Sequence, residues 1–172
     1  MLRILGKIQR IGIVTEPVPK LDEPALTEIG EQLKAGIGEK FGGSLAIREV
    51  DAGSCNGCEL EIHALNNPYY GIERFGVHFV ASPRHSDMLL VTGPVSRHME
   101  MALRRTYAAT PEPRLVIAVG ECGANGGEFG ISYASCGAVA NVIPVDAVIR
   151  GCPPTPFALM RGILEAIGKR SS

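Results

Sequence analysis

The sequence predicts an α/β fold in which helices flank a mostly parallel sheet, preceded by an N-terminal helical arm. From Ser44 onward, short apolar runs alternate with segments of helical periodicity, which is the pattern of strands joined by crossover helices. A length of 172 residues suits one domain with some terminal extension. No internal repeat or low-complexity tract interrupts the alternation. We therefore expect an arm at residues 1–43 and an α/β domain at residues 44–172.

The arm contains two candidate helices. In the first, the apolar residues recur at helical spacing and the basic residues take another face, and the pattern ends before Pro17. The second begins near Pro24 and ends where glycines accumulate from Gly36 onward. Either both helices pack on their own domain, or the basic one docks on a partner subunit or an anionic membrane surface. The residues of the first pattern are Met1, Ile4, Leu5, Ile8 and Ile11 on the apolar face and Arg3, Lys7 and Arg10 on the basic face.

The α/β domain is expected to have five strands and three helices. The strands are predicted at 45–50, 77–81, 88–92, 115–119 and 142–148, and the helices at 58–65, 98–107 and 157–167. Only residues 82–87 separate the second and third strands, whereas a parallel crossover needs a dozen residues or more. The second strand is therefore predicted to be an antiparallel edge strand or to lie outside the main sheet.

Composition excludes several classes of protein. The chain has 17 Lys and Arg against 18 Asp and Glu, so no basic field favours nucleic acid. No apolar run approaches the roughly 20 residues that span a bilayer, and the opening residues lack the pattern of an export signal. We therefore expect a cytoplasmic protein, with peripheral attachment to the inner membrane left open. In that compartment thiols stay reduced, so the five cysteines favour metal binding over disulfides.

Three cysteines directly follow predicted strands. Cys55, Cys122 and Cys152 come after the first, fourth and fifth strands, and Cys58 shares a loop with Cys55. In open parallel sheets the ligand site lies beyond the carboxyl ends of the strands, so we expect these four thiols to meet there. Cys136 precedes the fifth strand and is predicted to be a buried structural thiol away from the site.

Four thiolates can bind zinc or an iron–sulfur cluster. Structural zinc sites commonly use two pairs of closely spaced cysteines. This chain has one such pair, the Cys55–Cys58 hook, and two isolated cysteines in Gly-rich or Pro-rich loops. This arrangement favours an iron–sulfur cluster, which is the larger cofactor, over zinc. Glycines beside the cysteines would allow close approach and supply backbone N–H donors, and Pro153 would stiffen the last loop. The third strand ends at the site, so Thr92 is expected to face it. The other expected cofactor contacts are Gly53, Gly57, Gly93, Gly120 and Gly123.

Several segments together resemble the small subunit of membrane-bound [NiFe]-hydrogenases, and most closely the formate hydrogenlyase and energy-converting branch. The same fold family includes the cluster-bearing small subunit of respiratory complex I, in which the first two ligands are adjacent cysteines. Here Asn56 and Gly57 intervene, as in the hydrogenase branch. The segments that carry the resemblance are AGSCNGCELEI at 52–62, SPRHSDMLLVTGP at 82–94, GECGANGG at 120–127, PVD at 144–146 and GCPPTP at 151–156.

The resemblance implies a flavodoxin-like, mostly parallel sheet and one proximal [4Fe–4S] cluster on Cys55, Cys58, Cys122 and Cys152. It also implies three kinds of partner: a [NiFe] large subunit, a ferredoxin-like iron–sulfur subunit and integral membrane subunits. This chain would then relay electrons as a subunit of an oxidoreductase that lies on the cytoplasmic face of the membrane. The alternatives are the cluster subunit of a complex I-like quinone oxidoreductase and a zinc-stabilised interaction module.

Other residues carry weaker signals. Glu59 follows a predicted ligand and could relay protons, whereas solvation or pairing is the ordinary fate of such a carboxylate. Arg84 and His85 precede the third strand, where an interface role competes with plain solvation. The sequence leaves open the electron donor and acceptor, the cluster potential, whether dihydrogen is the substrate, and whether protons or sodium ions are pumped.

Overall fold

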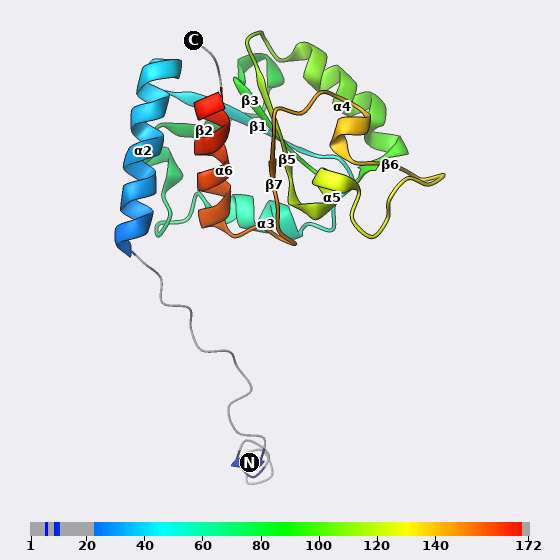
Figure 1. Cartoon of the computed structure of the whole chain (residues 1–172), viewed down its shortest axis with the longest axis horizontal. Helices are drawn as coiled ribbons and strands as arrows, with labels where there is room; N and C mark the ends of the chain where they lie inside the picture. Colours follow the sequence, from blue (N-terminus) through cyan, green and yellow to red (C-terminus); the bar gives the residue numbers. More distant parts are fainter. Residues whose placement is uncertain (1–5, 7–8, 11–22, 170–172) are drawn as a thin grey trace.

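The structure is a computed structural model of the chain, and it describes residues 6, 9, 10 and 23–169. Its centre is a sheet of five parallel strands in the order β2-β1-β3-β5-β7 (Figure 1). These strands are β1 (Leu45–Asp51), β2 (Val77–Phe79), β3 (Met88–Thr92), β5 (Leu115–Val119) and β7 (Ala147–Ile149). The predicted α/β class with a mostly parallel sheet is confirmed.

Helices cover both faces of the sheet (Figure 1). One face packs against α2 (Glu23–Phe41), α3 (Gly57–Ala64), the short helix η1 (Ile72–Phe75) and α6 (Pro156–Lys169). The other face packs against α4 (Arg97–Ala109) and the short helix η3 (Val139–Asn141). The remaining elements are η2 (Pro83–His85), α5 (Gly120–Asn125) and a two-stranded antiparallel ribbon of β4 (Val95–Ser96) and β6 (Ser135–Gly137).

Local sequence explains where the covering helices begin. The Ser96 side chain caps α4 by accepting a 3.3 Å hydrogen bond from the backbone N–H of Met99. Thr155 does the same for α6 through Ala158, at 3.2 Å, and Pro156 takes the first helical position, where its fixed φ suits the turn. Both starts have the Ser or Thr cap that favours a helix N-terminus, and α6 has a proline at its first position as well.

The prediction for the second strand was wrong. β2 is an edge strand but pairs with β1 in parallel, with Phe79 opposite Ile47. Met88, the first residue of β3, lies opposite the same Ile47 from the other side of β1. Because β2 ends at the level where β3 begins, the connection does not return along the sheet, and a short segment is enough. The last predicted strand is also shorter than expected, since residues 142–146 lie outside β7.

The second helix of the arm packs on its own domain. Helix α2 lies along α6 and buries Leu33 and Ile37 completely. The Lys40 ammonium donates hydrogen bonds of 3.0 and 3.4 Å to the carbonyls of Ile167 and Gly168 at the end of α6. Gly36 and Gly38 were expected to help end this helix but lie within it, because burial of Ile37 outweighs their low helix propensity. The helix ends at Phe41, directly before Gly42 and Gly43, which both have positive φ. The first predicted helix, at residues 1–11, lies largely outside the described residues.

Two aspartates from the quoted segments fix the start of the sheet. Asp87 accepts a 2.9 Å hydrogen bond from the backbone N–H of Ala46, and Asp146 accepts one of 2.7 Å from Val116. Ala46 lies one residue before the β1–β3 pairing begins, and Val116 lies one residue before the β5–β7 pairing begins. Each aspartate thus accepts a hydrogen bond from a backbone N–H that the neighbouring strand does not reach. Their role in these segments is thus to hold neighbouring strands in register.

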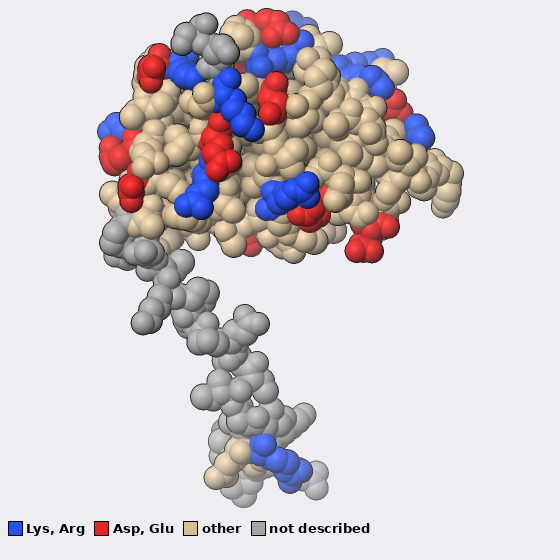
Figure 2. Space-filling view, viewed as in Figure 1, with Lys and Arg blue, Asp and Glu red and all other residues tan. Residues whose placement is uncertain are grey.

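Two further features bear on how the chain could attach to a membrane or a partner. None of the described helices is long and apolar enough to cross a membrane. On the face seen in Figure 2, basic and acidic side chains are interspersed and form no single field of one sign.

Candidate functional site

Four cysteines surround one cavity of about 140 Å³ at the carboxyl ends of β1, β3, β5 and β7. Cys55 and Cys152 are exposed, whereas Cys58 and Cys122 are half-buried. The cavity therefore opens to solvent on one side and reaches into the domain on the other. Its lining consists of Ser54, Cys55, Gly57, Cys58, Gly93, Glu121, Cys122, Gly151, Cys152 and Pro153.

The loop between β1 and α3 presents the first two thiols. Its start is fixed by the Asp51 carboxylate, which accepts hydrogen bonds from the backbone N–H groups of Gly53 and Ser54 at 2.8 and 2.9 Å. Burial opposes the charge of Asp51, but these hydrogen bonds outweigh it and lower its pKa. Asn56 then takes a left-handed conformation with φ 70°, which asparagine tolerates, and α3 begins at the next residue. Cys58 consequently lies in the first turn of α3.

The third thiol belongs to a helix rather than to a loop. Cys122 lies in α5, which the sequence patterns missed because it has only six residues. Glycine is needed at the start of α5, since Gly120 has φ +79°. The backbone N–H of Glu121 donates a 3.0 Å hydrogen bond to the carbonyl of Gly151, and its side chain pairs with Arg150 at 3.0 Å. These contacts hold α5 against the segment that carries Cys152.

Glycines next to the cysteines leave room for a bulky group. A β-carbon at Gly120 would lie 2.7 Å from the sulfur of Cys58, and one at Gly127 would lie 2.6 Å from the sulfur of Cys122. Real β-carbons essentially never approach other atoms so closely. The two positions thus keep their neighbouring sulfurs clear of side chains.

The four thiols influence one another electrostatically. Burial, then Glu59, then the other three cysteines raise the pKa of Cys58 to about 12. The pKa of Cys122 is raised by burial first and then by Cys152 and Cys55. Four thiolates in this space would repel one another unless a positively charged centre lay between them. Four thiols around a shared cavity fit an iron–sulfur cluster, whose ligand set is four cysteine thiolates.

Among residues 23–169 and the few described before them, no three His, Cys, Asp or Glu side chains are placed to hold one metal ion. Four thiols are also the ligand set of structural zinc, so donor chemistry alone does not separate the two cofactors.

The predicted cofactor contacts divide into two groups. Gly57, Gly93 and Pro153 line the cavity, and Gly120 lies against the Cys58 sulfur. The other three lie just behind the lining: a β-carbon at Gly53 would meet the Pro94 carbonyl, Thr92 is fully buried, and a β-carbon at Gly123 would meet the Val91 carbonyl. Ser54 and Gly151 also line the cavity and were not predicted. Their position directly before Cys55 and Cys152 was the available signal.

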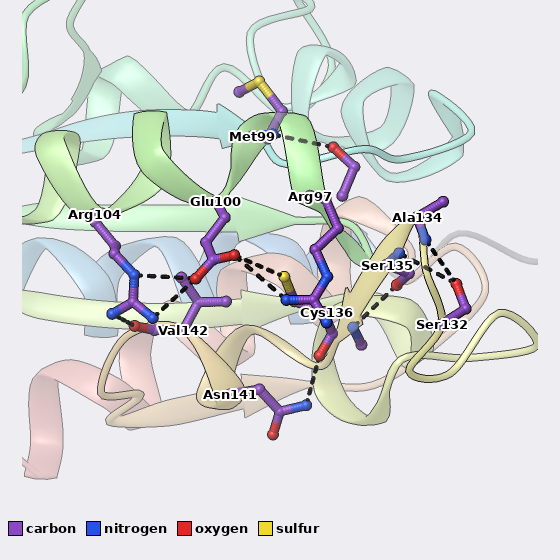
Figure 3. A network of polar contacts seen from close by, with 12 residues as sticks. Arg97, Met99, Glu100, Arg104, Ser132, Ala134, Ser135, Cys136, Asn141 and Val142 are labelled. Carbon is purple, nitrogen blue, oxygen red and sulfur yellow. Dashed lines mark hydrogen bonds and ion pairs between the residues drawn. The ribbon is translucent and has the colours of Figure 1, made fainter.

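Cys136 lies away from the cavity in β6, and it is buried (Figure 3). Its thiol donates a 3.3 Å hydrogen bond to Glu100 on α4, and Glu100 also pairs with Arg97 and Arg104. The thiol and then Arg104 lower the pKa of Glu100, whereas burial and then Glu100 raise the pKa of Cys136. Cys136 therefore joins the ribbon to α4.

The residues with weaker signals lie apart from the cavity lining. Arg84 and His85 form η2, at the amino end of β3, whereas the cavity lies at the carboxyl ends of the strands. Glu59 lies behind the cavity on α3 and is buried.

Comparisons with known proteins agree with the position of the site. Residues 55–166 match the family described as the NADH ubiquinone oxidoreductase 20 kDa subunit. Formate hydrogenlyase subunit 7 of Escherichia coli is 40% identical over 98% of this chain, and the alignment spans 63% of that protein. The probable membrane-bound hydrogenase subunit mbhJ of Pyrococcus furiosus is 44% identical over 75% of this chain and 77% of its own length.

A solved structure shows the same fold. It is the membrane-bound sulfane sulfur reductase, an archaeal respiratory membrane complex, one chain of which superposes with a TM-score of 0.65 and 35% identity. That superposition covers 80% of this chain and 75% of the other. The matched segment begins at Cys55 and includes all four cysteines of the cavity. From this extended match and these identities, the chain belongs to the family of the NADH ubiquinone oxidoreductase 20 kDa subunit.

Proposed function

We propose that this chain is the electron-transfer subunit of a membrane-bound hydrogenase complex and that it holds one [4Fe–4S] cluster on Cys55, Cys58, Cys122 and Cys152. The observation that carries the proposal is the convergence of these four thiols on one cavity at the carboxyl edge of the sheet. The bound cluster would accept and release one electron at a time. The chain spans less than two thirds of the formate hydrogenlyase subunit, and the activity of the whole complex is part of the proposal.

The residues of this chain would position the cluster and tune its surroundings. The Asp51 turn and the Asn56 conformation set the Cys55–Cys58 hook, and the Glu121–Gly151 hydrogen bond fixes the other two ligand segments relative to each other. Gly93 lines the cavity from the buried end of β3, and Pro153 lines it beside the exposed Cys152. The exposed side, with Cys55 and Cys152, is where an electron partner would approach.

The proposed partners are a [NiFe] large subunit, a ferredoxin-like subunit and integral membrane subunits, with this chain peripheral on the cytoplasmic face of the inner membrane. Support comes from two of the relatives, one a formate hydrogenlyase subunit and the other a probable membrane-bound hydrogenase subunit. The cysteine spacing in this chain also favours the hydrogenase branch, because two residues separate Cys55 from Cys58.

Metal analysis of anaerobically purified protein tests the cofactor. About four iron and four acid-labile sulfide per chain are expected, as one cubane cluster requires. Alanine at any one of the four cavity cysteines should lose or degrade the cluster, whereas Cys136→Ala should keep it. Stoichiometric zinc without sulfide would instead support a zinc-stabilised interaction module.

A second candidate is the cluster subunit of a complex I-like oxidoreductase that does not handle dihydrogen. The family match and the fold shared with a chain of the sulfane sulfur reductase complex support this second candidate. Purification of the native complex from the membrane fraction, followed by nickel analysis and a dihydrogen assay with a one-electron dye, distinguishes the two. Nickel-free material with quinone reductase activity would reject the hydrogenase complex and leave the cluster proposal intact.

A further inference from the structure

Strand β7 forms one edge of the five-stranded sheet, and no described strand pairs with its outer side. An open edge presents unpaired backbone groups that can pair with another strand, so natural proteins usually cover such an edge or place charged side chains on it. The middle residue of β7 is instead Val148, a large apolar residue that is 45% exposed. The centre of this edge is therefore open and apolar.

The register of the sheet shows which backbone groups of β7 point outward. The N–H of Leu115 donates a 3.0 Å hydrogen bond to the carbonyl of Asp87, so Leu115 and every second residue after it face β3. Ala118 consequently faces β7, where it lies opposite Val148. In a parallel ladder a residue bonds to the two neighbours of the residue opposite, so Val148 itself faces away from β5. The N–H and C=O groups of Val148 and Arg150 thus point to the open edge.

A groove lies beside these groups, between β7 and α6 (Figure 1). Helix α6 approaches β7 closely, since a β-carbon at Gly162 would overlap the Ile149 side chain. Phe157 and Arg161 of α6 line the other side of the groove. Its volume is about 240 Å³, below the roughly 300–1,000 Å³ of small-molecule pockets. The groove therefore suits a few side chains of a polypeptide better than a cofactor.

The charges along the groove favour an acidic side chain in it. Arg150 already pairs with Glu121 at 3.0 Å. Arg161 lies 5.7 Å from the centre of the Phe157 ring and forms no ion pair with any described residue. Glu165 also lines the groove, one turn further along α6, but does not pair with Arg161. A carboxylate brought by a ligand would therefore form a new charge-assisted hydrogen bond with this guanidinium.

We propose that an extended segment of a partner subunit, carrying an acidic residue, adds a sixth strand to the sheet along β7. Its backbone bonds to the outward groups of Val148 and Arg150, which repeat every two residues as the groups of a strand do. Its carboxylate pairs with Arg161. Cys152 follows Arg150 by two residues, so the added strand ends beside the four-cysteine cavity. The inference rests on the proposed function for the existence of a partner subunit, but not for the identity of the cofactor.

Amide hydrogen exchange tests the added strand, by comparing this chain in the native complex with the full chain released from it. The N–H groups of Val148 and Arg150 should exchange about tenfold more slowly, or slower still, in the complex. Those of Ala147 and Ile149 face β5 and should change little. This alternation distinguishes a paired strand from a partner surface that merely covers the edge.

Two pairs of variants separate the backbone contacts from the charge. Val148→Pro removes the outward N–H, which a sheet edge tolerates, and should return Arg150 to the exchange rate of the released chain. Val148→Thr keeps the N–H and a similar shape, and should retain the protection. Arg161→Glu should reduce the protection about threefold or more, because it places like charges together. Arg105→Glu, at an exposed position on α4, is its control and should change nothing.

The outcomes distinguish this inference from the proposed function. Equal exchange of Val148 and Arg150 in the complex and in the released chain would overturn the added strand, while about four iron and four sulfide per chain would still support the cluster. A chain that purifies without any partner would overturn the added strand and the proposed complex together.

A second measurement applies if the released chain or Val148→Pro does not stay folded. An electron cryomicroscopy map of the native complex should then show an extended segment of another subunit along β7, with a carboxylate at Arg161. A helix, a second copy of this chain, its own N-terminal residues or solvent in that position would overturn the proposal.

Discussion

A β-carbon at Gly120 would lie 2.7 Å from the Cys58 sulfur, so these two residues from different strand ends are in direct contact. Gly120→Ala should therefore displace Cys58 and strain a backbone with φ +79°. We expect cluster occupancy well below that of the wild type and a loss of stability of roughly 1–3 kcal/mol. Iron and sulfide per chain, together with thermal unfolding, measure both effects.

Gly38→Ala is the matched control. No atom lies within 4 Å of a β-carbon at this exposed position in α2, and its φ is helical. Alanine should leave the iron content unchanged and stabilise the helix by about 0.5–1 kcal/mol. If Gly120→Ala kept full occupancy, the close contact would not control the position of Cys58.

The Asp51 turn predicts a pH dependence. Its pKa is lowered from the ordinary 3.8, so its contribution is fully present above that value and is lost as the pH falls through the folded-state pKa. Asp51→Asn should cost roughly 0.5–1 kcal/mol at neutral pH, at the low end for a charged acceptor because the side chain is exposed. Unfolding of both proteins at neutral and acidic pH measures this. The difference should shrink in acid, and a constant difference would contradict the role of the charge.

The thiols should differ in reactivity once the cofactor is removed. With a pKa of about 12, Cys58 is a thiolate in roughly 10⁻⁴ of molecules near pH 8. Exposed Cys55 and Cys152 should react with iodoacetamide first, and Cys58 and buried Cys136 last. Peptide mass spectrometry over time gives the order. Equal rates for Cys55 and Cys58 would show that the metal-free loop does not keep this conformation.

Strands and covering helices could be predicted because their apolar periods are strong and uninterrupted. The pairing of β2 could not, since it depends on β2 ending at Phe79 and β3 beginning at Met88 at the same level of β1, and the hydrophobic pattern carries no such register. Helix α2 continues across Gly36 and Gly38 because it packs against α6. Gly30, earlier in the same helix, packs against Phe75, since a β-carbon there would overlap the Phe75 ring. Tertiary contacts of this kind override local propensity.

The convergence of four cysteines could be predicted because three of them follow strands, the carboxyl ends of parallel strands share an edge, and Cys58 shares a loop with Cys55. What could not be predicted is the difference between residues that line the cavity and residues one layer behind it. Gly57 and Gly123 both neighbour a cysteine in sequence, yet only Gly57 lines the cavity. Which residues line the cavity depends on the direction of the backbone at each position, and a glycine has no side chain whose pattern would indicate that direction.

The aspartates that hold the strands should support the fold without touching the cofactor. Asp146 accepts a 2.7 Å hydrogen bond from Val116 N–H at the amino end of β5, whereas Cys122 follows the carboxyl end of that strand. Removing a charged acceptor from a partly buried donor costs about 1.5–3 kcal/mol. Asp146→Ala should therefore lower the unfolding temperature while the folded protein keeps its full iron content at low temperature. Asp87→Ala, which removes the equivalent hydrogen bond from Ala46, should behave alike. Loss of iron from folded Asp146→Ala protein, but not from Asp87→Ala, would instead show that the β5–β7 register is transmitted along the sheet to Cys122 and Cys152.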